Sequence, residues 1–224
     1  ALSCGVSTGL EGFALPDSNG EWRGFDVDYC RALATAILGD PQAVQFIPTT
    51  SRSGFTALAS GEADVLSRHT SWTFSRDVDL KMDFVGINYY DGQAFMIPRA
   101  LGVISASELD GATVCIQTGT TTELNLADFF RRNGISYAPV PIETTSEAQQ
   151  QYLAGACDVI TTDAAGLAAM RATFESPDDH IILPELISKE PLGPLVRHGD
   201  PAFTTIAKAV LNTLVMAEEL GVTS

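Results

Sequence analysis

Apolar residues along the chain follow two spacings, one typical of strands and the other typical of helices. Short apolar runs bounded by polar residues or glycine predict strands, and they occupy residues 2–6, 44–47, 63–66, 94–97, 112–116, 159–161 and 180–183. Apolar residues three or four positions apart predict helices, and this spacing occurs at residues 26–38, 55–61, 144–153, 164–174 and 203–220. The alternation of the two patterns predicts an α/β fold with largely parallel sheets.

Polar clusters follow three of the predicted strands, at the end where each strand stops. They are residues 67–76, residues 118–122, and Thr162 with Asp163. Open α/β sheets bind ligands beyond the carboxyl ends of their strands, so we expect these clusters to contain ligand-binding groups. Thr120 and Glu123 have the spacing of a capping box, which predicts that a helix begins there.

The composition argues against several classes of partner. The 224 residues are 45% hydrophobic, enough for a sizeable core, and no apolar run approaches the roughly 18 residues that a membrane span needs. The formal net charge of −15 and the sequence pI near 4.4 argue against a nucleic acid and against docking on an anionic membrane surface. The charges are spread along the chain, so we interpret them as solubilising.

The four cysteines, Cys4, Cys30, Cys115 and Cys157, contain no C-x-x-C spacing, which disfavours a zinc site or a dithiol redox motif. Three pairings are possible for four cysteines. The pairing of Cys4 with Cys30 and of Cys115 with Cys157 keeps each bridge within one half of the chain. The alternative is four buried thiols, because a reduced cysteine packs as a small hydrophobic residue. Export to an oxidising compartment would favour the bridges.

Several groups in the polar clusters suit a zwitterionic amino acid. A carboxylate prefers a planar guanidinium with hydroxyl or backbone donors, which Arg76, one turn beyond Thr73, could supply. Residues 119–121 could add donors at a helix N-terminus, and Asp163 could accept the ammonium. Each group also has a simpler interpretation. Arg76 could pair with Asp77 at the surface, the turn could be an ordinary helix cap, and Asp163 could be the N-cap of the next helix.

Motifs for catalysis and for cofactors are missing from the sequence. It contains no H-E-x-x-H and no second histidine at ligand spacing, no G-x-S-x-G, and neither glycine-rich nucleotide motif. We therefore expect no catalytic residue, no metal and no cofactor. His69 stands among hydroxyl residues and could act as a base, but a lone histidine in such a stretch is more often a hydrogen-bonded structural residue.

At these clusters the chain resembles the periplasmic solute-binding proteins of polar amino acid ABC transporters, family 3, and among them the general L-amino acid-binding type. The matching segments run in order along nearly the whole chain. They are GFDVD at 24–28, SGEADV at 60–65, LSRHTSWTFSR at 66–76, DGQ at 91–93, QTGTTTEL at 117–124, TTD at 161–163 and SKEPLGP at 188–194. The G-F-D-[IV]-D, threonine–arginine and Q-x-G-T-T-x-E elements are specific only in combination.

The resemblance implies a type II periplasmic binding protein fold, in which two lobes joined by two hinge strands close on the ligand like a Venus flytrap. Each lobe would have a central, mostly parallel sheet. Lobe 1 would comprise residues 1–91 and 189–224, and lobe 2 residues 92–188. The protein would be a periplasmic monomer that carries a free L-amino acid to ABC transporter permease subunits, with its export signal absent from this chain.

The resemblance also implies a role for individual residues. Arg76 would bind the ligand carboxylate together with Ser71 and with the backbone N–H and hydroxyl of Thr121. Asp163 would bind the ammonium, helped by acceptors near His69. The remaining residues of the expected site are Thr118 and, around the side chain of the ligand, Ser7, Leu10, Ser51 and Trp72.

Some positions depart from the pattern of the resembled family. Many relatives have an acidic and an aromatic residue where this chain has Ser7 and Leu10, which puts a preference for cationic ligands in doubt. Close relatives usually have asparagine in place of His69. General-type relatives also continue well beyond a last helix such as the one at 203–220, so we expect the natural protein to be longer.

Two other classes of function share the fold that the resemblance implies. Some dehydratases acting on prephenate or arogenate resemble it, and they would need a general acid in the cleft, for which His69 is the only unusual candidate. A ligand-binding domain of a receptor is the other alternative. Such a receptor would continue into a membrane span, which these 224 residues do not contain.

Overall fold

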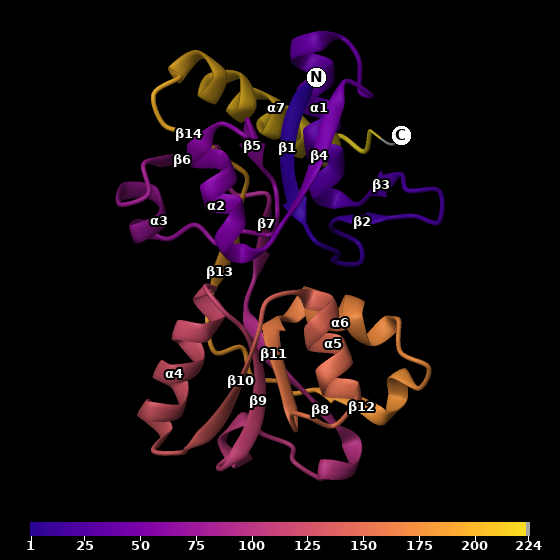
Figure 1. Ribbon diagram of the computed structural model, residues 1–224, viewed down its shortest axis with the longest axis vertical. Coiled ribbons are helices and arrows are strands. Elements are labelled where there is room, and N and C mark those ends of the chain that lie inside the picture. Colours follow the sequence, from indigo (N-terminus) through magenta and orange to yellow (C-terminus); the bar gives the residue numbers. More distant parts are fainter. Residues whose placement is uncertain (223–224) are drawn as a thin grey trace. The chain divides into compact units, whose positions relative to one another are not determined.

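Two compact units make up the residues that the computed structural model describes, 1–222 (Figure 1). The first unit contains residues 1–7, 12–90 and 191–222, and the second contains residues 8–11 and 91–190. Each unit has its own sheet and its own core. The assignment of the units to two lobes that close on a ligand stays a prediction.

A five-stranded sheet is the centre of the first unit. The strands of this unit are β1 (Leu2–Ser7), β2 (Leu15–Pro16), β3 (Trp22–Arg23), β4 (Val44–Thr49), β5 (Val65–Leu66), β6 (Met82–Phe84) and β14 (Leu195–Arg197). Its helices are α1 (Phe25–Leu38), α2 (Ser51–Ser60), α3 (Phe74–Val78) and α7 (Pro201–Glu219). The sheet has the order β4-β1-β5-β14-β6. β4, β1 and β5 are parallel, whereas β14 is antiparallel to both of its neighbours.

Helices cover both faces of this sheet, because its strands are apolar on both sides. On one face, Val6 of β1 belongs to a core that includes Leu33 of α1 and Leu211 of α7. On the other face, Leu66 of β5 belongs to a core that includes Leu58 of α2. β1 is covered on both faces although its sequence alternates. Leu2, Cys4 and Val6 belong to the first core, whereas Gly5 lies against Leu66 of the second.

The second unit repeats this arrangement with a different set of residues. Its strands are β8 (Gln93–Pro98), β9 (Ala112–Gln117), β10 (Tyr137–Ile142), β11 (Val159–Asp163) and β12 (His180–Ile182), and its helices are α4 (Thr121–Asn133), α5 (Thr145–Leu153) and α6 (Ala164–Ala172). The sheet order is β10-β9-β11-β8-β12, with the first three strands parallel and β8 antiparallel to both neighbours. Two short strands, β7 (Tyr89–Asp91) and β13 (Glu190–Leu192), form a separate pair, and the chain passes between the units within them.

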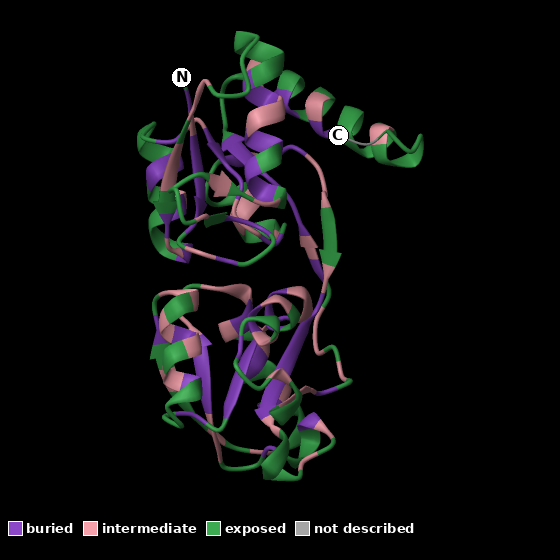
Figure 2. Ribbon diagram, turned by 90° about the vertical axis from the view of Figure 1, so that its right-hand side faces the viewer, coloured by how far each residue is buried: buried purple, intermediate pink, exposed green. Residues whose placement is uncertain are grey.

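Successive residues of β8 point to opposite faces of the second sheet. Phe95 belongs to the core that includes Phe130 of α4, whereas Met96 belongs to the core that includes Tyr152 of α5 and Leu167 of α6. Figure 2 shows the resulting pattern, with buried strands between helices whose outer surfaces are exposed. The α/β class predicted from the sequence is confirmed, and each sheet combines three parallel strands with two others that introduce antiparallel pairs.

Both disulfides join elements within one unit. Cys4 of β1 is bonded to Cys30 of α1, with the Cα atoms 6.3 Å apart, and Cys115 of β9 is bonded to Cys157, with the Cα atoms 5.6 Å apart. All four residues are buried. The structure therefore confirms the bridges and the pairing within each half of the chain.

Most predicted helices and strands are present, and the exceptions have local causes. β10 was not predicted, because Pro139 and Pro141 argue against a strand. It is an edge strand, where a missing backbone N–H can face away from the sheet. α3 and the antiparallel strands β6 and β14 have five residues or fewer, too few for a periodic pattern. Among the described residues, no helix has the length and apolar character needed to cross a membrane.

Candidate functional site

Arg76 lies in α3, directly after the polar segment that follows β5. Its Nη1 donates to the carbonyl of Ser71 at 2.8 Å, and its guanidinium lies 5.1 Å from the centre of the Phe55 ring. The Thr73 hydroxyl accepts from the backbone N–H of Arg76 at 3.3 Å and so caps α3. The first unit thus orients the guanidinium of Arg76. The Thr73 hydroxyl, which could have joined Arg76 at a ligand, instead caps the helix.

A second guanidinium, that of the half-buried Arg68, lies in the first unit. Burial and the positive charge of Arg76 lower the pKa of Arg68 to about 10, against the opposing effect of Asp26. Two guanidinium groups within electrostatic range of each other make this part of an acidic chain suited to an anion. Arg68 was not among the residues predicted individually from the sequence.

The GFDVD element places a buried carboxyl group within electrostatic range of Arg68. Gly24 has a φ of 124°, and a Cβ there would collide with the carbonyl of Phe13, so only glycine fits before α1. Asp26 is 3% exposed and accepts from the Ser67 hydroxyl at 3.1 Å. Burial raises the pKa of Asp26, and the charge of His69, the bond from Ser67, the charge of Arg68 and the His69 backbone N–H counteract the rise. Asp26 therefore fixes the turn that follows β5.

His69 occupies an unusual backbone conformation within this turn. Its φ is 56°, in the left-handed region that histidine adopts more readily than most residues do. Its ring packs edge-on against Phe13, with centres 4.2 Å apart, and lies 6.3 Å from the ring of Tyr89. This packing favours the structural interpretation of His69 over that of a catalytic base.

Four other predicted residues of the first unit border the same sheet edge or the turn. Ser7 ends β1 opposite Thr49 of β4, and Ser51 begins α2; both are 3% exposed. Ser71 is also buried. Trp72 is 37% exposed, and its ring stacks on that of Phe84 with centres 5.2 Å apart.

In the second unit, the predicted start of α4 is confirmed. The Thr120 hydroxyl accepts from the backbone N–H of Glu123 at 3.2 Å, and α4 begins at Thr121. The Glu123 carboxylate accepts from Gly119 at 2.9 Å, one residue before the N-cap. Thr118 precedes this turn and donates its backbone N–H to Ile142 at 3.0 Å. The turn is therefore a helix cap. The backbone N–H groups of the first turn of α4 lie at the helix N-terminus, where an anion is favoured.

Asp163 ends β11 and holds the N-cap position of α6, yet another carboxylate performs the capping. The side chain of Asp163 makes no capping bond within the described helix. Asp91 accepts from the backbone N–H of Ala165 at 3.1 Å, and the Gly92 carbonyl accepts from that of Ala164 at 2.9 Å. Asp163 is therefore the N-cap residue of α6, as the simpler interpretation has it, but it makes no side-chain capping bond there. Asp163 is 5% exposed, at the carboxyl end of the strand beside β9.

Leu10 belongs to the short segment of residues 8–11, which is part of the second unit. It is 8% exposed, and a Cβ added to Gly166 of α6 would lie 3.7 Å from its Cδ1. Leu10 therefore packs against the first turns of α6, the helix that begins directly after Asp163.

The structure brings the predicted residues together in two groups, one in each unit. In the first unit, Arg76 and Ser71 are directly bonded. In the second unit, Thr121 follows the carboxyl end of β9, and Asp163 ends the neighbouring strand β11. Four supporting residues were not predicted individually: Asp26, Arg68, Asp91 and Glu190. Three of them are acidic residues within the matching segments, and this acidic character was the signal that could have identified them.

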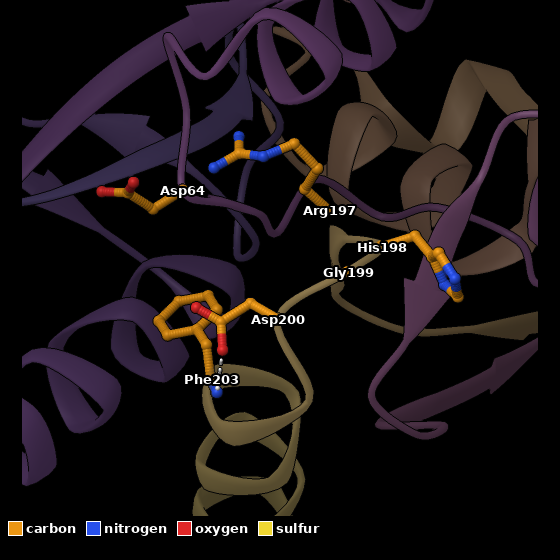
Figure 3. Close-up of a pocket in the computed structure, with 6 residues that line it drawn as sticks. All are labelled: Asp64, Arg197, His198, Gly199, Asp200 and Phe203. Carbon is orange, nitrogen blue, oxygen red and sulfur yellow. Dashed lines mark hydrogen bonds between the residues drawn. The ribbon is translucent and has the colours of Figure 1, made fainter.

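A hollow of about 320 Å³ on the first unit lies apart from all the predicted residues (Figure 3). Its polar groups stabilise the fold. Asp64 accepts from the backbone N–H of Ser3, Arg197 donates to the carbonyl of Leu58, and Asp200 caps α7 through Phe203. We therefore do not assign a ligand to it.

Comparison with known proteins gives one family over almost the whole chain. The model of the bacterial extracellular solute-binding proteins, family 3, matches residues 2–222. The chain is 59% identical over 222 residues to the glutamate/glutamine/aspartate/asparagine-binding protein BztA of Rhodobacter capsulatus and 54% identical to the general L-amino acid-binding periplasmic protein AapJ of Rhizobium johnstonii. Both matches include 99% of this chain but only 66% and 65% of the relatives. The chain therefore spans about two thirds of their length.

A solved structure agrees with this result. A periplasmic binding protein of an ABC transporter from Brucella ovis, with glutathione bound, has a TM-score of 0.95 and 55% identity, covering 99% of this chain and 70% of that one. The match confirms the predicted type II periplasmic binding protein fold. Both curated relatives are named as binding proteins rather than as enzymes, which disfavours the dehydratase alternative.

Proposed function

Because the chain belongs to family 3 of the bacterial extracellular solute-binding proteins, we propose that it binds a free L-amino acid and carries it to the permease of an ABC transporter. The observation that carries the proposal is the 59% identity, over 99% of the chain, to a protein named for binding glutamate, glutamine, aspartate and asparagine. These four amino acids are the first candidates. The protein would act in the periplasm as a monomer.

In this proposal the two units are the lobes, and each contributes one charged partner. Arg76, with Ser71, binds the α-carboxylate from the first unit, and Asp163 binds the α-ammonium from the second. Thr121 contributes its backbone N–H, because a hydroxyl has a single hydrogen and that of Thr121 is donated to Glu190 at 3.1 Å. Closure would exclude water from both charge pairs.

The energy that such a site must supply is modest. Binding with a micromolar dissociation constant corresponds to about −8 kcal/mol. Losing one partner of a buried, hydrogen-bonded charge pair typically costs about 2–5 kcal/mol, so two pairs together with apolar contacts are sufficient. The head group, which all L-amino acids share, would then dominate affinity.

Around the side chain of the ligand, the proposed neighbours are small or apolar. Ser7, Leu10, Ser51 and Trp72 have no formal charge, so none of them selects for a cationic ligand. We expect several polar and aliphatic L-amino acids to bind rather than one alone.

A thermal-shift screen against the twenty amino acids tests this function, because a ligand that binds only the folded state raises the melting temperature. We expect L-glutamate, L-glutamine, L-aspartate or L-asparagine to raise it, and the D-enantiomers of the same compounds to leave it unchanged. A chain that responds to none of the twenty, or to both enantiomers alike, would contradict the proposal.

Glutathione is a second candidate ligand, because the similar Brucella ovis protein has glutathione bound. The γ-glutamyl end of glutathione has a free α-ammonium and a free α-carboxylate, so the same two charged partners could bind it. Reduced glutathione, added to the same screen, should then raise the melting temperature, and L-glutamine should compete with it. A shift that L-glutamine cannot reduce would place glutathione outside the proposed amino acid site.

A further inference from the structure

Glu190 is a buried carboxylate at the end of the second unit, where the chain enters β13. It is 3% exposed, and burial of a charged group is unfavourable unless hydrogen bonds compensate. Three side chains donate to it. Asn125 donates to Oε1 at 2.7 Å, Ser188 donates to Oε1 at 2.6 Å, and Thr121 donates to Oε2 at 3.1 Å. Both carboxylate oxygens are therefore engaged.

Two of these donors belong to the start of α4. Thr121 is its first residue and Asn125 lies one turn later, so Glu190 holds the first turn of the helix at two points. The third donor, Ser188, lies on the same segment as Glu190 and accepts from the backbone N–H of Gln93 at 3.2 Å. Glu190 thus connects the segment that leaves the unit to the helix turn that contains Thr121.

Gln93 holds the next residue of the same turn. Its side-chain amide donates to the Thr122 carbonyl at 3.1 Å and to the Thr161 hydroxyl at 2.9 Å. Gln93 is fully buried and pairs with Asp163 in the ladder between β8 and β11. The first turn of α4 is therefore hydrogen-bonded by both Glu190 and Gln93. Of these two residues, Gln93 is also paired with Asp163 at the end of β11.

From this arrangement we infer that Glu190 is a positioning residue of the amino acid site, acting through Thr121 and Asn125. The inference rests on the proposed function, in which the Thr121 backbone N–H binds the ligand carboxylate. Glu190 takes the hydroxyl hydrogen of Thr121 and fixes the direction of the first turn of α4, so that the N–H is aligned before the ligand arrives. Glu190 itself does not need to touch the ligand.

The reach of the side chain is what gives Glu190 this role. Glu190→Asp keeps the charge but withdraws the carboxylate by about 1.5 Å, the length of one carbon–carbon bond. That is enough to break hydrogen bonds, which need heavy-atom distances below about 3.2 Å. A purely electrostatic role would tolerate this change, whereas a positioning role would not.

Calorimetric titration with L-glutamine tests the inference on three variants of the full chain. We expect Glu190→Asp to weaken binding about tenfold. In a Thr121→Val/Asn125→Ala background, which has lost both α4 donors, adding Glu190→Asp should weaken binding by less than about twofold, because interactions along one path are not additive. In ligand-free protein, Glu190→Asp should also speed amide hydrogen exchange across residues 121–126.

Thr113→Val is the matched control for these variants. Thr113 donates its hydroxyl to Asp158 at 2.6 Å at the opposite end of β9, so the control removes the same kind of bond from the same unit. Its affinity for L-glutamine should stay within about twofold of wild type. Wild-type affinity in Glu190→Asp, or an equal loss in both backgrounds, would overturn the positioning role alone. Failure of the wild type to bind any of the twenty amino acids would instead overturn the proposed function and this inference with it.

Discussion

The guanidinium of Arg76 is oriented by groups of its own unit. The Ser71 carbonyl accepts one of its hydrogens at 2.8 Å, and the Phe55 ring lies against it at 5.1 Å. A side chain held in this way loses little conformational freedom when a ligand binds. Lysine could not reproduce both contacts, because a compact ammonium lacks the planar fork of the guanidinium.

Asp163 makes no side-chain capping bond to α6, so its replacement tests binding without removing the cap of that helix. We predict that Asp163→Asn weakens L-glutamine binding by well over tenfold, because the ammonium loses its charged partner, a loss of about 2–5 kcal/mol. The melting temperature should change little, because Asp91 caps α6. Calorimetry and thermal melting measure both quantities.

The control for this variant is Asp128→Asn, which alters an exposed carboxylate of the second unit that pairs with Arg131. It should bind L-glutamine as the wild type does. Equal affinities of Asp163→Asn and Asp128→Asn would remove Asp163 from the site.

Asp26 makes stability depend on pH, with a sign set by burial. Because burial raises its pKa, the folded state holds the proton more tightly than the unfolded state, whose pKa is about 3.9. This contribution to stability is present at low pH and is lost as pH rises from the unfolded to the folded pKa. We predict that Asp26→Asn removes the loss, so that its melting temperature improves relative to wild type between pH 4 and pH 8.

Melting curves at several pH values measure this difference directly. Asp64→Asn serves as a control, because Asp64 also accepts a backbone hydrogen bond in the first unit, from Ser3 at 2.9 Å, and its difference from wild type should not grow in this direction. A constant difference for Asp26→Asn, or one that shifts toward the wild type at higher pH, would contradict the assigned cause.

At the scale of elements, local patterns predicted what local forces determine. The start of α4 followed from the spacing of Thr120 and Glu123, and the end of α2 followed from Gly61, which has a φ of 82°. β10 was missed because its prolines are acceptable only at a sheet edge, and edge position depends on the order of strands in the whole sheet.

The hydrogen bonds that orient the site residues could not be predicted from local patterns either, because they join residues far apart in the sequence. Asp91 caps a helix 74 residues away, and Glu190 bonds Thr121 across 69 residues. Sequence spacing contains no trace of such pairings. The chemistry of the polar clusters and the resemblance to a family together supplied Arg76, Thr121 and Asp163 as candidates, but the residues that orient them became visible only with the fold.

One disulfide links β1 to α1 and the other links β9 to the loop before β11, and their removal should affect stability more than binding. Cys115→Ala/Cys157→Ala opens a link across 42 residues and should lower the free energy of unfolding by about 2–4 kcal/mol. Alanine avoids leaving a buried hydroxyl without a partner. Denaturant unfolding of the oxidised protein measures the loss.

The wild type treated with a reductant is the comparison for this variant. Because the reductant also opens the bridge between Cys4 and Cys30, the reduced wild type should be less stable than the double alanine variant, while both still bind L-glutamine under conditions in which they are folded. A variant as stable as the oxidised wild type would contradict the contribution assigned to this bridge.

At the scale of the whole molecule, the chain is two units with separate cores, connected through β7 and β13. The proposed carboxylate partner lies in one unit and the proposed ammonium partner in the other. A ligand that needs both must bind more weakly when either is removed, and a ligand held by one unit alone would not have this dependence. Tight binding in this proposal therefore depends on a shared head group bound from both sides.

Calorimetric titration of L-glutamine into the wild type, Arg76→Ala and the exposed control Arg52→Ala tests this claim most directly. We predict that the wild type and Arg52→Ala bind with similar affinity, and that Arg76→Ala binds well over tenfold more weakly, as expected when a carboxylate loses its guanidinium. Equal affinity of Arg76→Ala and the wild type for L-glutamine would contradict binding of the head group from both units.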